Sequence, residues 1–475
     1  MSNNHLPNQR LAGMRTKVQA NKREFVLDPV FSALGRERSF FVKTYGCQAN
    51  EADSEAISGL MVACGFDVAE NYESADFIIV NTCAVRENAE KKVYGLLGGF
   101  KDLKRKNPNL KLIVAGCMMQ QETVVERIIK TFRHVDIVIG THNIDRLPAY
   151  IARLDREQRQ LIEVLSVEGE VIEKFPLLRS HRYKALVNIM YGCDEFCTYC
   201  IVPYTRGKER SRQLADIVEE VKSLAEAGYQ EVTLLGQNVN AYGLDFNDRG
   251  QTFPELLRRL QRLPIPRIRF TTSHPKDFSK ELVDVLATGG NLMPSIHLPV
   301  QSGSNRILRA MNRKYTSESY LELVDYIYEK IPGISLSTDI IVGFPGESDA
   351  DFEATLNLVE LARFEGAYTF IYSPRPNTPA AKLTDTLPIE IKKERLYRLN
   401  ALVNAGFKRG NERFLNEVVP VLVDGVSKTD PRHYSGYTPN QKLVNFVATP
   451  SDVGKIRPVK ITEAMTWTLN GEIQE

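Results

Sequence analysis

The segment Tyr191-Gly192-Cys193-Asp194-Glu195-Phe196-Cys197-Thr198-Tyr199-Cys200 places three cysteines within eight residues. The apolar run 185–190 comes just before it and has the pattern of a buried strand. The cysteines therefore occupy a loop at the carboxyl end of that strand, where active sites of parallel α/β proteins form. Three thiols this close together are typical of a metal site or a redox centre.

Zinc and iron–sulfur are the two kinds of metal site to weigh for this loop. Structural zinc takes four ligands, usually as two separated pairs, and no fourth cysteine or histidine stands close by in the sequence. An iron–sulfur cluster normally takes four thiolates, so three thiolates leave one iron open to another ligand. The pattern favours an iron–sulfur cluster, with zinc or buried thiols as the alternatives.

The composition is that of a globular protein. At roughly 150 residues per domain, the 475 residues suggest about three domains. The net charge of +2 is too balanced to indicate a partner. No apolar run approaches the ~18 residues of a membrane span, and the amino terminus lacks a signal-peptide pattern. We therefore expect a cytoplasmic protein, without a membrane partner, whose seven cysteines are reduced.

Residues 38–150 repeat a pattern of strand, turn and helix, which predicts a flavodoxin-like parallel sheet. The expected strands are 40–46, 77–80, 112–116 and 135–139. The expected helices are 51–63, 87–106 and 122–132.

A cysteine follows each of the first three strands, namely Cys47, Cys83 and Cys117. Parallel strands end at one edge of a sheet, so these residues are expected to form a second three-thiolate cluster site; three ordinary buried cysteines are the alternative. His142 follows the fourth strand, and we expect a polar loop histidine rather than a fourth ligand. Cys64, on an apolar helix end, is expected in the core.

Residues 181–385 alternate strand and helix again, which predicts a partial (βα)6 TIM-like barrel. The expected strands are 185–190, 231–235, 267–271, 295–300, 335–342 and 367–372. The expected helices are 211–227, 253–263, 279–287, 317–330 and 349–363. Polar or glycine-rich loops follow several of these strands and would share the mouth of the barrel with the cysteine loop.

The remaining segments are less regular. Residues 1–37 are polar and mildly basic (Arg10, Arg15, Lys17, Lys22 and Arg23), so we expect a flexible tail that docks late in the segment, with an RNA-contacting arm as the alternative. Residues 151–180 are interpreted as a linker with a weak strand pair, 161–164 and 170–175. Residues 388–413 form a basic helix, read as a solvated face. Residues 414–475 predict a small antiparallel barrel, with strands 417–423, 442–448, 455–461 and 464–469 and turns at Asp424-Gly425 and Asn470-Gly471.

The cysteine loop resembles the Cys-x-x-x-Cys-x-x-Cys motif of the radical S-adenosylmethionine superfamily. Together with the three-cysteine sheet and the terminal barrel, nearly the whole chain resembles the methylthiotransferases of that superfamily. The stretches Asn81-Thr82-Cys83-Ala84-Val85-Arg86-Glu87-Asn88-Ala89 and Pro203-Tyr204-Thr205-Arg206 are similar to the branch that acts on N6-dimethylallyladenosine in tRNA.

The resemblance implies methylthiolation at C2 of that adenosine, beside the anticodon. It implies two 4Fe-4S clusters, one held by Cys193, Cys197 and Cys200 and the other by Cys47, Cys83 and Cys117. It also implies S-adenosylmethionine as radical source and methyl donor, with sulfur delivered at the second, auxiliary cluster. The catalytic groups beyond the clusters stay unassigned. Tyr199 is placed to pack near the adenine of the cofactor, and family analogy adds four loop or strand residues to the cofactor site: Gln237, Ser273, Gln301 and Asp339.

These expectations divide the chain into a tail (1–37), an auxiliary-cluster domain (38–150), a linker (151–180), a radical core (181–411) and a TRAM-like tRNA-binding domain (412–475). Arg206, Lys208, Arg210 and Arg212 are expected to face tRNA phosphates, with a solvated helix start as the alternative. The expected partners are tRNA carrying isopentenylated adenosine and an electron donor of flavodoxin or ferredoxin type, and the enzyme is expected to be a monomer.

Rival functions of three classes remain. Related enzymes methylthiolate threonylcarbamoyl-adenosine in tRNA or an aspartate of a ribosomal protein. A metal-binding RNA module without turnover would not need two iron–sulfur sites and a cofactor mouth. An electron-transfer protein would have no use for an RNA-binding end.

Overall fold

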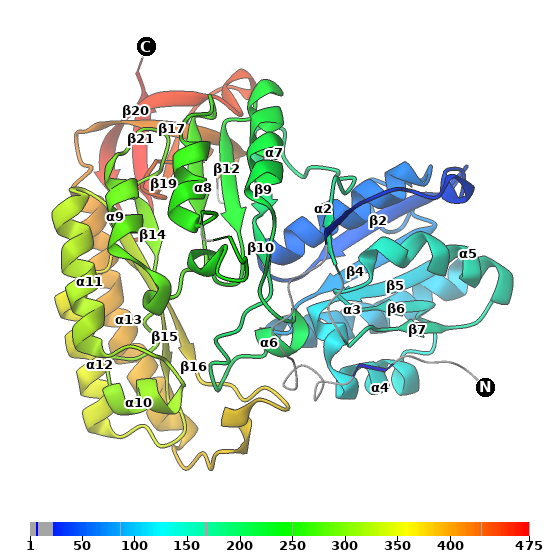
Figure 1. Cartoon of the computed structure of the whole chain (residues 1–475), viewed down its shortest axis with the longest axis horizontal. Helices are drawn as coiled ribbons and strands as arrows, with labels where there is room; N and C mark the ends of the chain where they lie inside the picture. Colours follow the sequence, from blue (N-terminus) through cyan, green and yellow to red (C-terminus); the bar gives the residue numbers. More distant parts are fainter. Residues whose placement is uncertain are drawn as a thin grey trace. The chain divides into compact units, whose positions relative to one another are not determined.

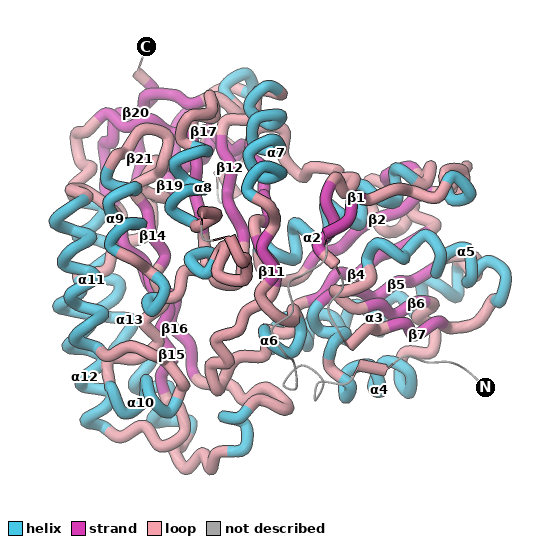
Figure 2. The backbone as a smooth tube through the Cα atoms, in the orientation of Figure 1, coloured by secondary structure: helices cyan, strands magenta, loops and turns pink. Residues whose placement is uncertain are grey.

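The computed structural model describes residues 6–7, 22–85, 87–166, 170–248, 250–428 and 430–474 (Figure 1). The chain divides into two compact units. The first comprises Met1–Ser180, Asn188–Phe196 and Cys200–Arg212, and the second comprises His181–Val187, Cys197–Tyr199 and Gln213–Glu475. Figure 2 traces the helices and strands along the backbone of each unit.

The first unit is built on a six-stranded parallel sheet in the order β3-β2-β4-β5-β6-β7. This order confirms the flavodoxin-like prediction, and its topological switch point lies between β2 and β4, where the direction of winding reverses. The strands are β2 (Ser39–Thr44), β3 (Asp67–Val68), β4 (Phe77–Thr82), β5 (Lys111–Gly116), β6 (Ile137–Ile139) and β7 (Leu161–Glu163).

Helices cover both faces of this sheet, and each face has its own core. All six residues of β4 are buried, as expected for a strand covered on both sides. Ile78 and Val80 belong to the core beneath α3 and α4, whereas Phe77 and Ile79 belong to the core beneath α2 and α5. The helices are α2 (Gln48–Ala63), α3 (Glu87–Lys106), α4 (Glu122–Thr131) and α5 (Leu147–Glu157).

Both strands expected within 151–180 are present, but they do not pair with each other. Strand β7 extends the main sheet beside β6, whereas β8 (Val171–Glu173) pairs in parallel with β1 (Lys22–Glu24). The two segments do not pair with each other because each finds a parallel partner elsewhere. Arg10, Arg15 and Lys17 of the expected tail lie outside the described residues, and its later part carries β1 and the short helix η1 (Pro29–Phe31).

The second unit contains the expected six-stranded partial barrel, as two three-stranded sheets ordered β13-β12-β9 and β14-β15-β16. The strands are β9 (Lys184–Asn188), β12 (Glu231–Leu235), β13 (Arg267–Phe270), β14 (Ser295–His297), β15 (Ser335–Val342) and β16 (Gly366–Ile371). The helices are α7 (Leu214–Glu226), α8 (Phe253–Leu260), α9 (Lys280–Ala287), α10 (Asn305–Ala310), α11 (Ser317–Lys330), α12 (Asp349–Ala362) and α13 (Ile389–Glu412).

The main local difference from prediction lies around the cysteine loop. The strand expected over 185–190 ends at Asn188, and β10 (Met190–Tyr191) pairs antiparallel with β11 (Arg210–Ser211) in the first unit. Because Arg210 and Ser211 are part of this hairpin, the helix expected from Ser211 begins only at Leu214. The one-turn helix α6 (Val202–Thr205) lies inside the same hairpin.

The carboxyl-terminal segment forms a small closed barrel, as expected, with five strands in the order β17-β18-β19-β21-β20. It is not wholly antiparallel as predicted, because β19 and β21 pair in parallel. The turns expected at Asp424-Gly425 and Asn470-Gly471 are wrong, because both dipeptides lie inside strands. The register shifts between Val423 and Gly425, as at a bulge. The strands are β17 (Val418–Val426), β18 (Tyr434–Tyr437), β19 (Leu443–Val447), β20 (Ile456–Ala464) and β21 (Leu469–Ile473).

Within the second unit, this small barrel is anchored at the amino ends of the large barrel's strands. The Arg267 guanidinium donates hydrogen bonds to the carbonyls of Tyr437 (2.8 Å) and Pro420 (2.7 Å). The Arg269 guanidinium donates to the carbonyls of Pro439 (2.9 Å) and Thr438 (2.7 Å). Both arginines are buried, so these bonds are shielded from water and fix the docking.

Helix α13 is less solvated than predicted. Lys392 and Arg395 are buried; Lys392 pairs with Asp385, and Arg395 pairs with Glu347 and with Asp349 at 2.6 Å each. Part of the basic face is therefore neutralised inside the unit. Across the described ranges, no helix combines the length and the apolar character that a membrane crossing requires.

Candidate functional site

The three cysteines of the first unit stand at the carboxyl edge of its sheet. Cys83 and Cys117 directly follow β4 and β5, and Cys47 follows β2 as the residue that caps α2. Two of these strands, β2 and β4, flank the switch point at which such sheets bind ligands. Cys83 and Cys117 are buried and Cys47 is exposed.

The three thiols are close enough to interact electrostatically. Burial raises the pKa of the Cys117 thiol to about 12, and negative charge on Asp53, Cys83 and Cys47 adds to the rise, while Arg206 opposes it. Charges influence a pKa in this way only when the charged groups are near neighbours in a poorly solvated place. The fold thus brings together three residues that are separated by more than thirty positions each in the sequence.

A buried network of side-chain amides joins the loops that carry these cysteines. Asn50 Nδ2 donates to the carbonyl of Thr82 (3.0 Å), and Asn81 Nδ2 donates to the Asn50 carbonyl (2.8 Å) and to Ser54 Oγ (2.9 Å). Thr82 Oγ1 donates to the Ala115 carbonyl at 2.6 Å. Because buried polar groups need their partners, this network fixes the cysteine loops after β2, β4 and β5 relative to one another.

Gly116 permits this close approach. Its φ is +99°, and a Cβ atom there would lie 2.3 Å from Asn81 Oδ1 and 2.6 Å from the Thr82 carbonyl oxygen. Only glycine combines this backbone conformation with the absence of a side chain. The residue before Cys117 is therefore matched to the amide network.

Arg206 contacts this site directly, which corrects the prediction that it faces phosphate. Its Nε donates to Cys117 Sγ at 3.0 Å, and its guanidinium pairs with Asp53 of α2 at 2.6 Å. Burial alone disfavours the charged guanidinium, but Asp53 and Cys117 raise the pKa of Arg206 well above its usual value. Asp53 thus neutralises a buried cation that holds a cysteine sulfur.

Arg210 and Arg212 are also structural. Arg212 is buried against Glu173, with 2.6 Å between Nη2 and Oε2. Arg210 donates to the carbonyls of Lys208 (3.3 Å) and Arg206 (3.2 Å). Their positive charges support the hairpin that follows the cysteine loop, and Lys208 is half-buried in the same hairpin.

The loop Cys193–Cys200 crosses between the two units, with Cys193 and Cys200 in the first and Cys197 in the second. In the first unit, the Cys193 N–H donates to the Gly207 carbonyl at 3.1 Å. Gly192 has a φ of +76°, and a Cβ there would lie 1.9 Å from the Lys208 carbonyl. The hairpin thus sets the path of the loop at its first cysteine.

In the second unit, Cys197 also has an arginine neighbour. Arg313 Nη1 donates to Cys197 Sγ at 3.4 Å, Nη2 donates to the Pro299 carbonyl (2.8 Å), and Nε donates to the Tyr315 hydroxyl (2.8 Å). Arg313 is buried. Within the described part of the chain, its contacts are to neutral groups, whereas Arg206 has a carboxylate partner.

The five residues expected at the cofactor site all lie in the second unit. Tyr199 packs against the apolar cluster that contains Phe344 and Tyr372. Gln301, with a φ of +70°, exchanges backbone hydrogen bonds with β15: its N–H donates to the Asp339 carbonyl at 2.8 Å. Asp339 lies on β15, with Oδ1 3.4 Å from His297 Nε2. Gln237 and Ser273 occupy the loops after β12 and β13.

Several buried polar atoms at the carboxyl ends of the strands have no hydrogen-bond partner among the described residues. They include Ser273 Oγ, both amide atoms of Asn240, Asn238 Oδ1 and Tyr372 Oη. Buried polar atoms normally have partners, so these atoms fit a polar ligand at the mouth of the barrel. The sequence analysis did not select Asn238, Asn240 or Tyr372 as cofactor contacts. For Asn238 and Asn240 the available signal was the one that selected Gln237, a strand followed by a polar loop.

The donor sets fit iron–sulfur chemistry. Among the described residues, no group of three or more His, Cys, Asp or Glu side chains is spaced to hold a single metal ion. A cubane spreads its thiolates over separate irons, so its ligands stand farther apart than those of one ion. Thiolates are the ligands such clusters take, so three cysteines at one edge of the sheet, Cys47, Cys83 and Cys117, fit this chemistry.

Two other predicted residues can be placed. Cys64 is a core residue beside α2, as expected, and burial raises the pKa of its thiol to about 11. His142 is half-buried in the loop after β6. In that loop, Thr141 Oγ1 donates to the Thr205 carbonyl at 2.8 Å, which ties the loop to the residue before Arg206.

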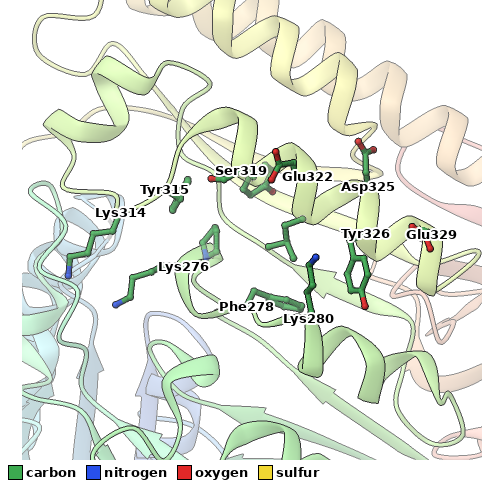
Figure 3. Close-up of a pocket in the computed structure, with 13 residues that line it drawn as sticks. Lys276, Phe278, Lys280, Lys314, Tyr315, Ser319, Glu322, Asp325, Tyr326 and Glu329 are labelled. Atoms are coloured by element: carbon green, nitrogen blue, oxygen red, sulfur yellow. The ribbon is translucent and has the colours of Figure 1, made fainter.

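A separate groove of about 710 Å³ lies in the second unit, along α9 and α11 (Figure 3). Lys276 and Lys314 lie at one end of it, and Glu322, Asp325 and Glu329 lie toward the other. Its two ends therefore differ in charge. Asp325 and Glu329 belong to α11, so the groove lies in the helical layer. The buried polar atoms without hydrogen-bond partners lie elsewhere, at the carboxyl ends of the strands.

Three family descriptions match the chain: the radical SAM superfamily over residues 187–359, uncharacterized protein family UPF0004 over 39–140, and the TRAM domain over 412–473. A tRNA-2-methylthio-N(6)-dimethylallyladenosine synthase of Anoxybacillus flavithermus is 55% identical over 95% of this chain and 86% of its own length. That of Bacillus cytotoxicus is 54% identical over 99% of this chain and 92% of its own length.

The chain belongs to the tRNA-2-methylthio-N(6)-dimethylallyladenosine synthase family. Solved structures add evidence on the fold of this synthase-family chain. The radical S-adenosylmethionine methyltransferase TsrM from Kitasatospora setae, with cobalamin and a [4Fe-4S] cluster bound, aligns with a TM-score of 0.55 at 15% identity. The alignment covers 72% of this chain and 77% of that one, so the two proteins share a fold.

Proposed function

We propose that this protein is a radical S-adenosylmethionine tRNA methylthiotransferase, which places a methylthio group on C2 of N6-dimethylallyladenosine next to the anticodon. The observation that carries the proposal is a near full-length similarity to synthases of that name, in a chain that carries both cysteine triads. The protein is accordingly a transferase of tRNA modification that depends on S-adenosylmethionine and iron–sulfur clusters.

Cys193, Cys197 and Cys200 are proposed to hold the radical-generating 4Fe-4S cluster. When bound, such a cluster leaves one iron for S-adenosylmethionine and supplies the electron that generates a 5′-deoxyadenosyl radical, which takes hydrogen from an unreactive carbon. The protein's own part is to bind, orient and shield the cofactor. Arg313 orients Cys197, and the proposed cofactor contacts are Tyr199, Gln237, Ser273, Gln301 and Asp339.

Cys47, Cys83 and Cys117 are proposed to hold the auxiliary 4Fe-4S cluster, at which sulfur is delivered and then methylated by a second S-adenosylmethionine. The amide network of Asn50 and Asn81 keeps their loops in place. Cys47 is exposed, whereas Cys83 and Cys117 are buried, so we propose that reactants approach this group from the side of Cys47.

The domain scheme and partners are proposed on the same basis. Residues 38–150, 181–411 and 412–475 are assigned to the auxiliary-cluster domain, the radical core and the tRNA-gripping TRAM-like domain. The partners are a tRNA that carries isopentenylated adenosine and a flavodoxin- or ferredoxin-type electron donor. We assign a monomer acting in the cytoplasm, where that tRNA is found.

Mass spectrometry of tRNA nucleosides tests the function. Anaerobically reconstituted protein, incubated with reductant, S-adenosylmethionine and isopentenylated tRNA, is expected to form 2-methylthio-N6-dimethylallyladenosine and 5′-deoxyadenosine. Product on threonylcarbamoyl-adenosine, or on a ribosomal-protein aspartate supplied in a parallel reaction, would instead identify one of the rival reactions. Absence of all three products from an iron-replete sample contradicts the proposal.

Single-cysteine variants separate the two triads. Cys197→Ala is expected to abolish 5′-deoxyadenosine formation, whereas Cys83→Ala is expected to permit it but to stop thiolation. Iron should fall from about eight to about four per chain in each variant. Cys64→Ala, which removes a core cysteine, is the matched control and should keep both the iron and the product.

A further inference from the structure

The inner face of strand β16 carries two exposed aromatic side chains. Tyr368 is 62% exposed and Phe370 is 41% exposed, although aromatic residues usually bury most of their surface. Thr369, between them, points the other way, since its Oγ1 donates to Asn400 Oδ1 of α13 at 2.5 Å. Successive residues of a strand point to opposite faces, so Tyr368 and Phe370 point away from α13.

The neighbouring strand confirms which face this is. Tyr368 lies opposite Asp339 of β15, and Phe370 lies opposite Ile341. On β15, Asp339 and Ile341 are partly exposed, whereas the residues that alternate with them, Thr338, Ile340 and Val342, are fully buried. Strand β16 is also the last strand of its sheet. The aromatic pair therefore stands on the inner face of the barrel, on the strand at its edge.

Tyr368 is held in place from one side. Its ring packs edge-on against the His297 ring, with centroids 5.9 Å apart and planes at 71°. His297 is fixed in turn by Ser337 Oγ, 3.0 Å from its Nδ1. A tyrosine fixed in this way loses little conformational freedom when a second flat group packs on its open side.

The spacing of the pair suits one nucleobase. Residues two apart on a strand are separated by about 6.6–6.8 Å, with side chains roughly perpendicular to the sheet. Stacked bases repeat every ~3.4 Å, so a base between two rings needs about twice that distance. Aromatic side chains are the platforms on which proteins stack unpaired bases.

The surroundings point to a particular base. Ile341, opposite Phe370, packs against the apolar cluster of Met311 and Phe344, so this end of the platform suits a hydrocarbon substituent. At the other end, Lys442 of the small barrel donates to the carbonyl of Glu365, the residue before β16, at 3.3 Å. The platform thus runs from the apolar cluster to the segment that matches the TRAM domain.

We propose that Tyr368 and Phe370 sandwich the unpaired, prenylated adenine of the tRNA substrate, with Ile341 contacting the isoprenoid group. The proposal rests on the proposed function and adds to it the residues that recognise the target base. An enzyme that acts on a base carbon needs the base outside the helical stack, and a stacking sandwich repays part of that cost.

Equilibrium binding of a fluorescein-labelled anticodon stem-loop to the reconstituted holoenzyme tests the platform. One probe carries N6-dimethylallyladenosine beside the anticodon, and the other carries adenosine. Tyr368→Ala and Phe370→Ala are each expected to raise Kd for the prenylated probe about tenfold, because stacking contributes ~1–3 kcal/mol per base. Ile341→Ala is expected to reduce the preference for the prenylated probe over the adenosine probe.

Tyr397→Ala is the matched control, since Tyr397 is 78% exposed on α13 and lies outside the barrel sheet. It should bind both probes as the unaltered protein does. Tyr368→Phe should bind normally, and Tyr368→Leu, which keeps bulk without a ring, should lose affinity while iron content and circular dichroism stay unchanged.

The outcomes separate two failures. If the unaltered protein modifies the prenylated stem-loop but Tyr368→Ala and Phe370→Ala bind it as tightly as Tyr397→Ala, the platform is overturned and the proposed function stands. If the unaltered protein yields no methylthiolated product, the proposed function fails. If it then also binds the two probes with equal affinity, the proposed base-binding platform is overturned as well.

Discussion

The two cysteine triads that we propose as cluster ligands are brought together by opposite routes. Cys193, Cys197 and Cys200 lie in one short loop, so local sequence brings them together. Cys47, Cys83 and Cys117 come from three loops, and a sheet, an amide network and Gly116 bring them together. A triad assembled by tertiary structure depends on stability far from the metal, whereas a triad in one loop depends mainly on that loop.

The triads differ also in the charge beside them. Each has a buried arginine that donates to one cysteine sulfur, Arg206 to Cys117 and Arg313 to Cys197. Asp53 neutralises Arg206, whereas the contacts of Arg313 in the described chain are neutral. A cation near a cluster favours its reduced form, so we expect the environment of Cys197 to favour electron uptake more than that of Cys117.

The largest expected effect is on the tertiary triad. Arg206→Met leaves the Asp53 carboxylate buried without its cation, which should lower the free energy of unfolding by about 3–5 kcal/mol. Iron should fall to about four per chain, measured by colorimetric assay after anaerobic reconstitution. The matched control is Arg212→Met, which breaks a similarly buried pair with Glu173 away from the cysteines; if it loses the same iron, Arg206 has no special role.

Gly116→Ala should act on the same triad with a smaller effect. The new Cβ would meet Asn81 and Thr82 in a backbone conformation that disfavours alanine, at a cost of about 1–3 kcal/mol. Denaturant unfolding measures the loss, and Mössbauer spectroscopy should show weaker occupancy of the auxiliary site alone. Gly95→Ala, in α3 with open space around its Cβ position, is the control that should keep both clusters.

Arg313→Gln tests the charge difference. Loss of one hydrogen bond and of a buried positive charge should lower the reduction potential of the cluster at Cys197, by about 20–60 mV if the interaction contributes ~0.5–1.5 kcal/mol. An EPR-monitored redox titration of a Cys83→Ala background, which keeps only that cluster, measures the shift. An unchanged potential would remove the asymmetry that we infer.

A pH dependence of stability is expected from a histidine near Arg313. Burial lowers the pKa of His274 to about 2, and the positive charges of Arg313, Lys276 and Lys314 add to the effect. An unfolded histidine titrates near 6.5, so below that pH only the unfolded chain gains the proton, and stability should fall by about 1.4 kcal/mol per pH unit. His274→Asn should flatten the dependence of Tm on pH between 6.5 and 5, and an equally steep slope in that variant would contradict the assignment.

Local patterns were sufficient to predict most elements of this fold. Strand–helix alternation predicted the flavodoxin-like sheet and the six-stranded partial barrel, because apolar periodicity reflects which faces are buried. Errors arose where tertiary pairing overrides local signals. Asn470-Gly471 is a strong turn pattern, yet it lies in β21, where Gly471 lets the backbone of β20 approach closely.

The cysteines of the candidate site could be picked out from the sequence, whereas the residues that contact them could not. Cysteine spacing is a local property, and the placement of Cys47, Cys83 and Cys117 followed from the parallel topology. Arg206 was misread because a run of basic residues is usually solvated or bound to phosphate. Its burial depends on Asp53, more than 150 positions earlier, a pairing that no local pattern reveals.

The anchoring of the small barrel through Arg267 and Arg269 has a consequence for how a substrate is positioned. Four hydrogen bonds from buried guanidinium groups hold that module to the amino ends of the large barrel, which opposes movement of one barrel relative to the other. If this module binds the tRNA as we propose, the bound RNA would meet the large barrel at a set distance. The enzyme would then select its adenosine by its distance along the anticodon arm as well as by the identity of the base.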